Sequence, residues 1–317
     1  MHIVVLDGFT LNPGDLDWQP LAQLGTLTLY DRTAPELVLE RAKPADVLLL
    51  NKVKMDAALL SQLPRLRCIV VLATGYNNID TAAARALGID VCNAVGYGSA
   101  EVAQHAFALL LALTNQVALH HEAVQRGEWS AQPDFSLLKK PMASLSGLCF
   151  GLFGLGRIGQ CMAGIAQAFG MRVVAVRGNP DRPAPEGVTL VSLETLFADS
   201  DVLCLTAPLT SKTRRVVHAG TLATMKPTAL LLNTGRGELI DETALREALL
   251  SGTIAGAALD VLDGEPPRAD HPLFGLPNCI ITPHIAWAAT AARQRLMDIT
   301  FQNVKAFLAG KPMHVVN

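Results

Sequence analysis

Short apolar runs alternate with helix-length segments along almost the whole chain. In the first third, the predicted strands are Ile3–Leu6, Leu27–Tyr30, Val47–Leu50, Cys68–Leu72 and Asp90–Asn93. A second series comprises Leu148–Phe153, Arg172–Val176, Val202–Leu205, Ala229–Leu232, Ala257–Val261 and Cys279–Ile281. Apolar strands separated by helices are typical of parallel sheets that are covered on both faces. The pattern therefore predicts an α/β protein with two doubly wound parallel-sheet domains.

Two further segments are predicted to be long helices. The segment Glu101–Gly127 has no helix breaker before its glycine, and Ala106–Leu113 is apolar on all sides, so we expect one buried helix used as core or subunit interface. The amphipathic tail Thr290–Leu308 ends at Gly310-Lys311-Pro312, a helix stop. We expect this tail to return to the first domain.

Length and composition fit two well-buried domains. The chain has 317 residues, of which 50% are hydrophobic and 17% charged, and one compact core rarely grows that large. We expect residues 1–98 and 287–317 to form one domain and residues 99–286 the other. The net charge of −2 does not favour nucleic acid or an anionic membrane as a partner, and the apolar runs are too short to cross a bilayer.

The six cysteines have no paired spacing and lie mostly in strand-like segments. We interpret them as reduced core residues, with no disulfide framework and no metal site. The first residues read as a strand rather than a signal peptide. Together these features predict a cytoplasmic protein.

A glycine-rich turn follows the strand Leu148–Phe153. It reads Gly154-Leu155-Gly156-Arg157-Ile158-Gly159 and leads into a helix predicted from Gln160 to Phe169. Such glycines permit a tight turn, close approach of the backbone to a pyrophosphate, and close packing of helix on strand. The N–H groups at the start of the helix favour phosphate. With a strand before it and a helix after it, this turn predicts dinucleotide binding.

The end of the next strand usually carries the acidic residue that binds the ribose 2′-hydroxyl of the cofactor. Here Arg177, Gly178 and Asn179 follow the strand, within a Pro-rich stretch 179–185 that is predicted to be a loop. A cation at this place suits a 2′-phosphate, which predicts NADP as the preferred cofactor, with NAD also possible. The alternative is that Arg177 is a solvated loop charge and Asp181 reaches the ribose.

Polar residues also follow three later apolar runs, where open α/β sheets bind their ligands. Arg236 follows one run, Glu265 lies in the loop after Asp260, and His284 follows the last run. Hydride reduction of a 2-keto acid needs a fixed cation for the carboxylate and carbonyl, and an acid that titrates near neutrality. Arg236 and His284 supply both, and a Glu beside the imidazole would orient it. We interpret the following histidines as ordinary core or surface residues: His105, His120, His121, His218, His271 and His314.

These motifs resemble those of the D-2-hydroxyacid dehydrogenases, and within them the glycerate dehydrogenase, or hydroxypyruvate (glyoxylate) reductase, group. The resemblance covers essentially the whole chain. Besides the glycine-rich turn, its most specific parts are Met225-Lys226-Pro227, Asn233-Thr234-Gly235-Arg236-Gly237, Leu259-Asp260-Val261, Glu265-Pro266 and Thr282-Pro283-His284-Ile285-Ala286-Trp287. In the N-terminal part they are Asn51-Lys52, Ala73–Asp80 and Gly96-Tyr97-Gly98-Ser99.

The resemblance implies a Rossmann cofactor domain at 99–286 and a flavodoxin-like substrate domain from the remaining residues. It implies that Arg236 binds and polarises the substrate and that Glu265 pairs with His284, the acid/base. Further substrate contacts would come from Asn51, Lys52, Thr74 and Gly75, the last two through their backbone. Cofactor contacts would come from Gly154, Leu155, Gly156, Arg157, Ile158, Gly159, Arg177, Gly178, Asn179, Ala207, Pro208, Thr234, Gly235, Asp260 and Ala286. The family also implies a homodimer formed through Glu101–Gly127.

The chain departs from the family pattern at three positions. Many members have Asp where this chain has Arg177, and Ala is common at Gly235 and Glu at Gln104. Two other functions stay open: an NAD(P)H-sensing protein similar to the corepressors related to this family, and a dehydrogenase of another small acid such as formate or phosphite. The complete set of catalytic residues and the low net charge weigh against the first. The keto acid is left open because specificity lies in loop shape.

Overall fold

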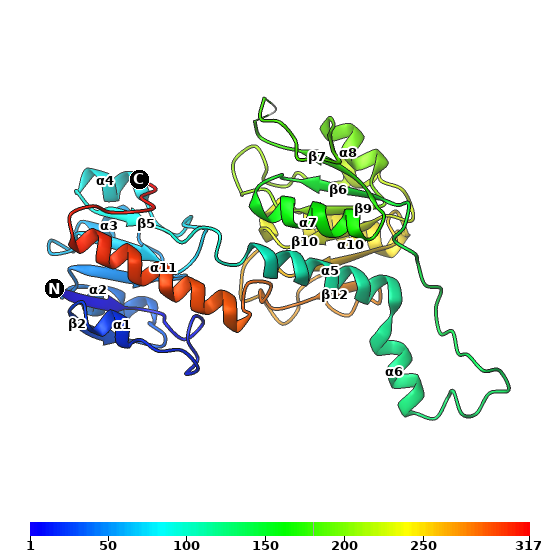
Figure 1. Ribbon diagram of the computed structural model, residues 1–317, viewed down its shortest axis with the longest axis horizontal. Coiled ribbons are helices and arrows are strands. Elements are labelled where there is room, and N and C mark those ends of the chain that lie inside the picture. The colour runs from blue at the N-terminus through cyan, green and yellow to red at the C-terminus, as the bar shows by residue number, and fades with distance from the viewer. Residues whose placement is uncertain (180) are drawn as a thin grey trace. The chain divides into compact units, whose positions relative to one another are not determined.

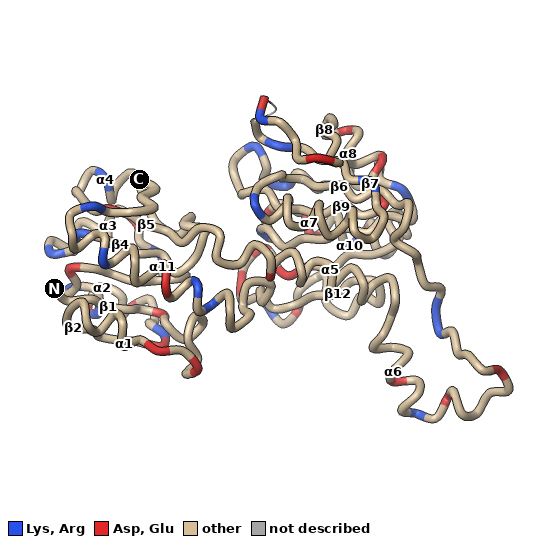
Figure 2. Tube along the Cα trace, viewed as in Figure 1, with Lys and Arg blue, Asp and Glu red and all other residues tan. Residues whose placement is uncertain are grey.

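Two parallel sheets organise the chain, one in each of two compact units. In the computed structural model, unit 1 comprises Met1–Gly98 and Ala288–Asn317, and unit 2 comprises Ser99–Trp287 (Figure 1). The structure describes residues 1–179 and 181–317, so residue 180 of the predicted loop 179–185 lies outside the described residues. The predicted α/β fold with two parallel sheets is confirmed. Charged residues of both signs are interspersed along each unit (Figure 2).

The sheet of unit 1 has the strand order β2-β1-β3-β4-β5, with every neighbouring pair parallel. This is the flavodoxin-like order. Its strands are β1 (His2–Val5), β2 (Thr26–Leu29), β3 (Val47–Leu50), β4 (Cys68–Val71) and β5 (Asp90–Cys92). Its helices are α1 (Gln19–Ala22), η1 (Pro35–Leu37), α2 (Val38–Ala42), α3 (Ala57–Leu60), α4 (Thr81–Ala86) and α11 (Thr290–Leu308). Helix α11 has the predicted bounds and packs on β4 of unit 1, as expected of the tail.

The sheet of unit 2 has the order β12-β11-β10-β9-β6-β7-β8 and is also parallel. Strand order reverses between β6 and β9, as in a Rossmann fold, and such folds bind ligands at the carboxyl ends of the strands there. The strands are β6 (Cys149–Phe153), β7 (Arg172–Val176), β8 (Val188–Leu190), β9 (Val202–Leu205), β10 (Leu230–Asn233), β11 (Gly256–Leu259) and β12 (Cys279–Ile281). Strand β8 was not predicted, because its three residues, Val188-Thr189-Leu190, are too short a run with a polar residue in the middle.

Helices cover both faces of this sheet. One face packs against α5 (Ser99–Asn115) and α7 (Arg157–Ala168), and the other against α8 (Leu193–Asp199), α9 (Ala219–Leu222) and α10 (Glu242–Ser251). The remaining elements are α6 (Val117–Gln125) and the short η2 (Gly237–Leu239). Helix α7 begins at Arg157, before the predicted start at Gln160, so the helix starts inside the glycine-rich turn.

The prediction of one helix over Glu101–Gly127 is wrong. Gln116 adopts a left-handed backbone (φ 52°, ψ 37°), which ends α5 and starts α6 at an angle of 55°. The Gln116 side chain donates a hydrogen bond to the carbonyl of Leu113 at 2.7 Å. This carbonyl therefore has a partner although the helix ends here. Helix α5 is the buried part, whereas in α6 only Ala123 is buried.

No single helix in the described ranges is long and apolar enough to cross a membrane; α5 and α6 pass that test only together, as a bent pair.

Candidate active site

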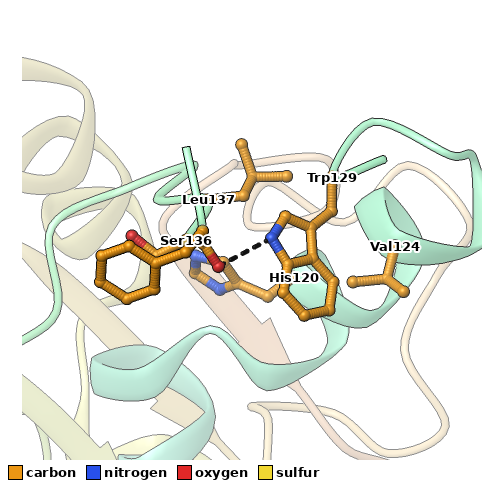
Figure 3. Close-up of a pocket in the computed structure, with 6 residues that line it drawn as sticks. His120, Val124, Trp129, Ser136 and Leu137 are labelled. Carbon is orange, nitrogen blue, oxygen red and sulfur yellow. Dashed lines mark hydrogen bonds between the residues drawn. The ribbon is translucent and has the colours of Figure 1, made fainter. Parts of the chain in front are cut away.

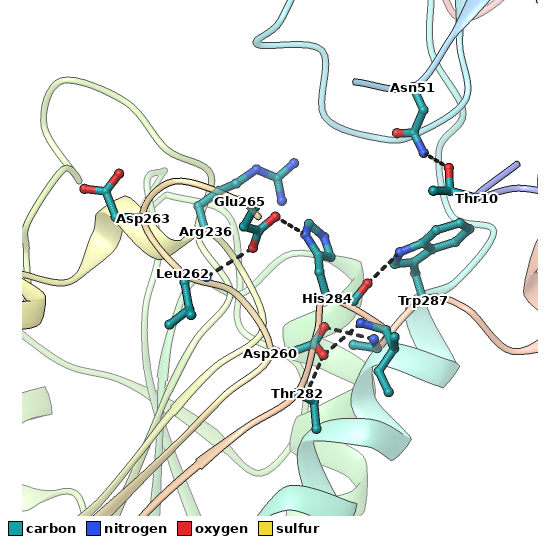
Figure 4. A network of polar contacts seen from close by, with 12 residues as sticks. Thr10, Asn51, Arg236, Asp260, Leu262, Asp263, Glu265, Thr282, His284 and Trp287 are labelled. Atoms are coloured by element: carbon teal, nitrogen blue, oxygen red, sulfur yellow. Dashed lines mark hydrogen bonds and ion pairs between the residues drawn. The ribbon is translucent and has the colours of Figure 1, made fainter. Parts of the chain in front are cut away.

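Glu265 and His284 form a direct pair at the carboxyl end of the unit 2 sheet (Figure 4). Nδ1 of His284 lies 2.5 Å from Oε2 of Glu265, and the other oxygen, Oε1, accepts the N–H of Leu262 at 3.1 Å. Because Nδ1 faces a carboxylate, it carries a proton, and this assigns the tautomer of the neutral ring. Nε2 of His284 has no hydrogen-bond partner within the part of the chain that the structure describes. The ring is therefore oriented on one side and available for proton transfer on the other.

Asp260 fixes the turn that presents His284. Its carboxylate is 1% exposed and accepts the N–H groups of Ile285 and Ala286, both at 2.9 Å, and its carbonyl accepts the N–H of His284 at 2.8 Å. The hydroxyl of Thr282 donates to the same carboxylate at 2.6 Å. His284 itself has a positive φ of 55°, a conformation that needs such support in a non-glycine residue.

His105 on α5 completes this network, a contact that its interpretation as an ordinary histidine missed. Its Nε2 lies 3.0 Å from Oγ1 of Thr282 and 3.4 Å from Oδ1 of Asp260. Burial raises the pKa of Asp260, but hydrogen bonds from His105, Thr282 and two backbone N–H groups outweigh it, so the pKa lies below its usual value. Asp260 is therefore a carboxylate at neutral pH. Its predicted contact with a cofactor stays a prediction.

Arg236 stands in a tight turn after β10. The Asn233 side chain closes the turn: Nδ2 donates to the carbonyl of Arg236 at 2.8 Å, and Oδ1 accepts the N–H of Gly235 at 3.0 Å. Nη1 of Arg236 donates to the carbonyl of Gly235 at 2.7 Å, and the rest of the guanidinium makes no other hydrogen bond to described residues. Arg236 thus offers free donors at the same end of the sheet as the Glu265–His284 pair (Figure 4).

The glycine-rich turn has the geometry that a pyrophosphate requires. A Cβ on Gly154 (φ 111°) would lie 2.6 Å from the N of Ala207, and one on Gly159 would lie 2.4 Å from the carbonyl O of Gly154. Both positions need glycine for close packing. A Cβ on Gly156 would meet nothing within 4 Å, and no side chain caps α7 at this residue. The backbone is therefore open to a phosphate at the start of the helix.

Thr234 supports the same site. Its Oγ1 is buried and has no hydrogen bond of normal geometry within the described ranges; its polar neighbour is the thiol of Cys204, a weak partner. A buried hydroxyl without a good partner at the end of β10 fits a ligand that supplies one. Together with the open Gly156 backbone, it fits a bound nicotinamide dinucleotide.

Arg177 ties the loop after β7 to the glycine-rich turn. Its Nη1 donates to the carbonyls of Arg182 and Pro183, both at 3.0 Å, and its Nη2 to the carbonyl of Leu155 at 3.4 Å. Arg177 is therefore part of the loop structure and not a freely solvated charge. Asp181, the alternative ribose ligand, is exposed.

In unit 1, the segment that begins with Asn51 and Lys52 is held by the half-buried carboxylate of Asp7. Asp7 accepts the N–H groups of Asn51 and Lys52, both at 2.7 Å, and that of Val53 at 3.3 Å. Burial raises the pKa of Asp7, although these bonds oppose the shift. Asn78 donates to the carbonyls of Asn51 and Val53. The sequence interpretation missed the anchoring role of Asp7, although this residue follows the apolar run of β1.

The turn at Thr74 and Gly75 is held by hydrogen bonds to Asn93 and Ala94. Oγ1 of Thr74 donates to the carbonyl of Ala94 at 2.8 Å, and Nδ2 of Asn93 donates to the carbonyl of Thr74 at 2.7 Å. The N–H groups of Thr74 and Gly75 donate to no residue in the described parts of the chain. Two such N–H groups suit a carboxylate.

The sequence profile of the D-isomer specific 2-hydroxyacid dehydrogenase, NAD binding domain, matches residues 107–286. The chain belongs to this family. The hydroxypyruvate reductase of Blautia hydrogenotrophica is 45% identical over 100% of both chains, and the glycerate dehydrogenase of Methylorubrum extorquens is 42% identical over 90% of both. The structure of an NADPH-dependent glyoxylate/hydroxypyruvate reductase from Sinorhizobium meliloti, in complex with NADP and malonate, has a TM-score of 0.85, 30% identity, and covers 99% of this chain and 96% of that one.

These similarities confirm the resemblance that the sequence motifs indicated. This D-2-hydroxyacid dehydrogenase is an oxidoreductase that uses a nicotinamide cofactor and acts on a small acid. The roles of its individual site residues stay predictions.

Proposed function

We propose that this dehydrogenase reduces a small 2-keto acid of the glyoxylate or hydroxypyruvate type to the D-2-hydroxy acid. The observation that carries the proposal is the Glu265–His284 pair, whose free Nε2 stands at the carboxyl end of a dinucleotide-binding sheet. Relatives that span the whole chain are named hydroxypyruvate reductase, glycerate dehydrogenase and glyoxylate reductase, which supports this substrate class.

In this proposal, a bound reduced nicotinamide supplies the hydride. His284, protonated at both nitrogens, gives its Nε2 proton to the substrate oxygen as negative charge develops there. Glu265 holds the ring through Nδ1 and stabilises its charged form. Arg236 directs its free N–H donors to the carboxylate and carbonyl of the substrate. Asn51, Lys52, Thr74 and Gly75 remain the proposed substrate ligands of unit 1.

We also propose that NADPH is preferred over NADH, with NADH still used. Two features support this preference: Arg177 stands where many family members have an acidic residue, and the similar Sinorhizobium meliloti enzyme is described as NADPH-dependent. Nε of Arg177 is not used in the loop contacts, so part of the guanidinium stays available. Gly178 and Asn179 next to it are exposed and leave room for a 2′-phosphate.

We also propose that the protein forms a homodimer through the region of α5, α6 and the segment after them. Large apolar side chains are exposed there, including Val117, Leu138 and Phe135, the last 92% exposed. A groove of about 320 Å³ runs between α6 and the segment that folds back on it, where Nε1 of Trp129 donates to the carbonyl of Phe135 (Figure 3). Exposed apolar surface of this kind favours a protein interface. All six cysteines are free thiols, which supports a cytoplasmic location.

The test is a panel of glyoxylate, hydroxypyruvate, pyruvate and bulkier keto acids, each with NADPH and NADH. We expect oxidation of the reduced cofactor with the smallest acids, and loss of it in His284→Ala. Tight cofactor binding without turnover of any keto acid would contradict the proposal and favour a sensing protein. Sedimentation of the pure protein tests the dimer.

A further inference from the structure

A second glutamate–histidine pair lies in unit 2, formed by Glu242 and His271. Nε2 of His271 lies 2.9 Å from Oε2 of Glu242, and the two side chains are only 6% and 13% exposed. The N–H of Leu273 faces Nδ1 of His271 at 3.4 Å, so Nδ1 accepts and Nε2 carries the proton that goes to Glu242. The ring also packs against Phe274, with centroids 5.1 Å apart. His271 is thus held on three sides.

The other oxygen of Glu242 holds a different point of the same loop. Oε1 accepts the N–H of Asp263 at 2.9 Å. One carboxylate therefore fastens both ends of the loop from Asp263 to His271, and Glu265 lies inside that loop. Glu242 is the first residue of α10, directly after Asp241, whose side chain caps the helix by accepting the N–H of Ala244. The anchor consequently belongs to a regular helix that packs on the sheet.

The loop needs such an anchor because every residue from Asp263 to Asp270 is exposed. An exposed loop with few buried apolar contacts opens locally at little cost in free energy. A contact of 2.5 Å between Glu265 and His284 tolerates only small displacements of the loop backbone.

We propose that Glu242 and His271 are positioning residues for Glu265: they hold the loop so that its carboxylate stays against Nδ1 of His284. This inference rests on the proposed function, in which His284 is the acid. Neither residue touches the reacting atoms; both act through Glu265. Asp260 and Arg236 are charged residues at the same strand ends, and neither forms a hydrogen bond with Glu242 or His271 within the described part of the chain.

The variants follow from the two contacts. His271→Leu removes the donor to Glu242, whereas His271→Gln keeps an N–H near the position of Nε2. Glu242→Gln is isosteric: it can still accept the N–H of Asp263 but can no longer accept from His271 as a carboxylate does. Asp270→Asn is the matched control, because its ion pair with Arg268 lies in the same loop but is exposed, at 71% and 86%. Glu265→Gln gives the effect of losing the carboxylate itself.

The measurement is the titration of the His284 ring in the full-length protein, followed by NMR of labelled imidazoles and assigned with His284→Asn. A protonated imidazole loses a favourable partner when a carboxylate contact is lost, so the midpoint of its titration moves to lower pH. We expect that shift in Glu265→Gln and in His271→Leu, a smaller shift in the same direction in Glu242→Gln, and the wild-type midpoint in His271→Gln and Asp270→Asn. The alkaline limb of kcat should move with it, and KM for the cofactor should not.

Cofactor binding and circular dichroism identify variants that have unfolded. If His271→Leu is unfolded, the titration midpoint of His284 in Glu242→Gln tests the proposal instead. The proposal is overturned if folded His271→Leu and Glu242→Gln titrate His284 at the wild-type midpoint. A wild-type protein that turns over no keto acid but shows the expected midpoint shifts would overturn the proposed function and support the positioning role. The ring titration does not depend on turnover, so the two failures are distinguishable.

Discussion

Gly237 and Leu262 are in such close contact that a Cβ on Gly237 would lie 1.9 Å from the carbonyl carbon of Leu262. This contact joins the turn that carries Arg236 to the start of the loop that carries Glu265. The relative placement of the proposed substrate-binding cation and the proposed carboxylate therefore depends on the missing side chain.

Gly237→Ala should consequently damage both stability and turnover. The obstructing atoms are backbone, so relief requires a shift of the turn or the loop, and overpacking of this kind costs about 1–3 kcal/mol or more. The matched control is Gly235→Ala, whose Cβ would lie 3.2 Å from the carbonyl O of Leu205 and 3.3 Å from a Leu239 methyl group. Chemical denaturation and kcat/KM should separate the two variants; equal values for both would contradict the contact.

His284→Ala should lower kcat by about 10²–10⁴-fold, because it removes the proton donor from the transition state. Binding of NADPH should persist, since the glycine-rich turn is unchanged. Kinetics and fluorescence titration of the cofactor measure the two effects. A variant that keeps more than a tenth of the wild-type kcat would exclude His284 as the acid.

Arg236→Ala should raise KM for the keto acid and lower kcat, because its free N–H donors are proposed to serve both substrate binding and the developing oxyanion. Arg236→Lys should restore little of either, since a single ammonium lacks the planar pair of donors. Steady-state kinetics with one keto acid tests this. Full rescue by lysine would show that only the charge matters.

Arg177→Asp should reverse the cofactor preference. A charge-assisted contact to a 2′-phosphate contributes roughly 1.5–3 kcal/mol, which corresponds to a preference of about 10–150-fold for NADPH in the wild type. Because Arg177 also holds the carbonyls of Arg182 and Pro183, Arg177→Met serves as control: it loses those contacts without adding a negative charge. If wild type favours NADH in kcat/KM, the preference that we propose is wrong.

Asp260→Asn should destabilise the fold in a pH-dependent way. The pKa of Asp260 lies below its ordinary value of 3.8, because its hydrogen bonds outweigh burial. A lowered pKa contributes stability above the ordinary value, and this contribution is lost as pH falls through the pKa of the folded state. The difference in unfolding free energy between wild type and Asp260→Asn should therefore be largest at neutral pH and should narrow as the pH falls below 3.8. Urea denaturation across this range measures it, and a constant gap would contradict an ionised Asp260.

Both sheets could be predicted because most of their strands, such as β3 and β9, are continuous apolar runs, a pattern that depends only on local sequence. The break at Gln116 could not, because a side chain rather than a glycine or proline stabilises it. Strand β8 was not predicted because it is only three residues long and Thr189 interrupts its apolar run. That Arg236, Glu265 and His284 lie at one edge of the sheet could be predicted because parallel strands bring their carboxyl ends together, whereas their catalytic roles stay predictions.

The contacts of His105 and His271 could not be predicted from the sequence for a different reason. His105 meets Thr282 across 177 positions of sequence, and His271 meets Glu242 across 29, so no short-range spacing reveals either pair. A lone histidine in an apolar or loop segment has no signal that separates an anchor from an ordinary residue. Only the folded chain shows which carboxylate it faces.

The hydrogen bonds that Asp7 accepts from the backbone N–H groups of Asn51, Lys52 and Val53 also affect the rate at which a ligand could bind there. Fixing the backbone of one residue costs about 1–2 kcal/mol of conformational entropy, and here folding has already fixed it. If an acid binds at Asn51 and Lys52, as we propose, it meets a backbone that is already ordered. Its association should therefore be governed by diffusion and charge rather than by a slow rearrangement of this segment.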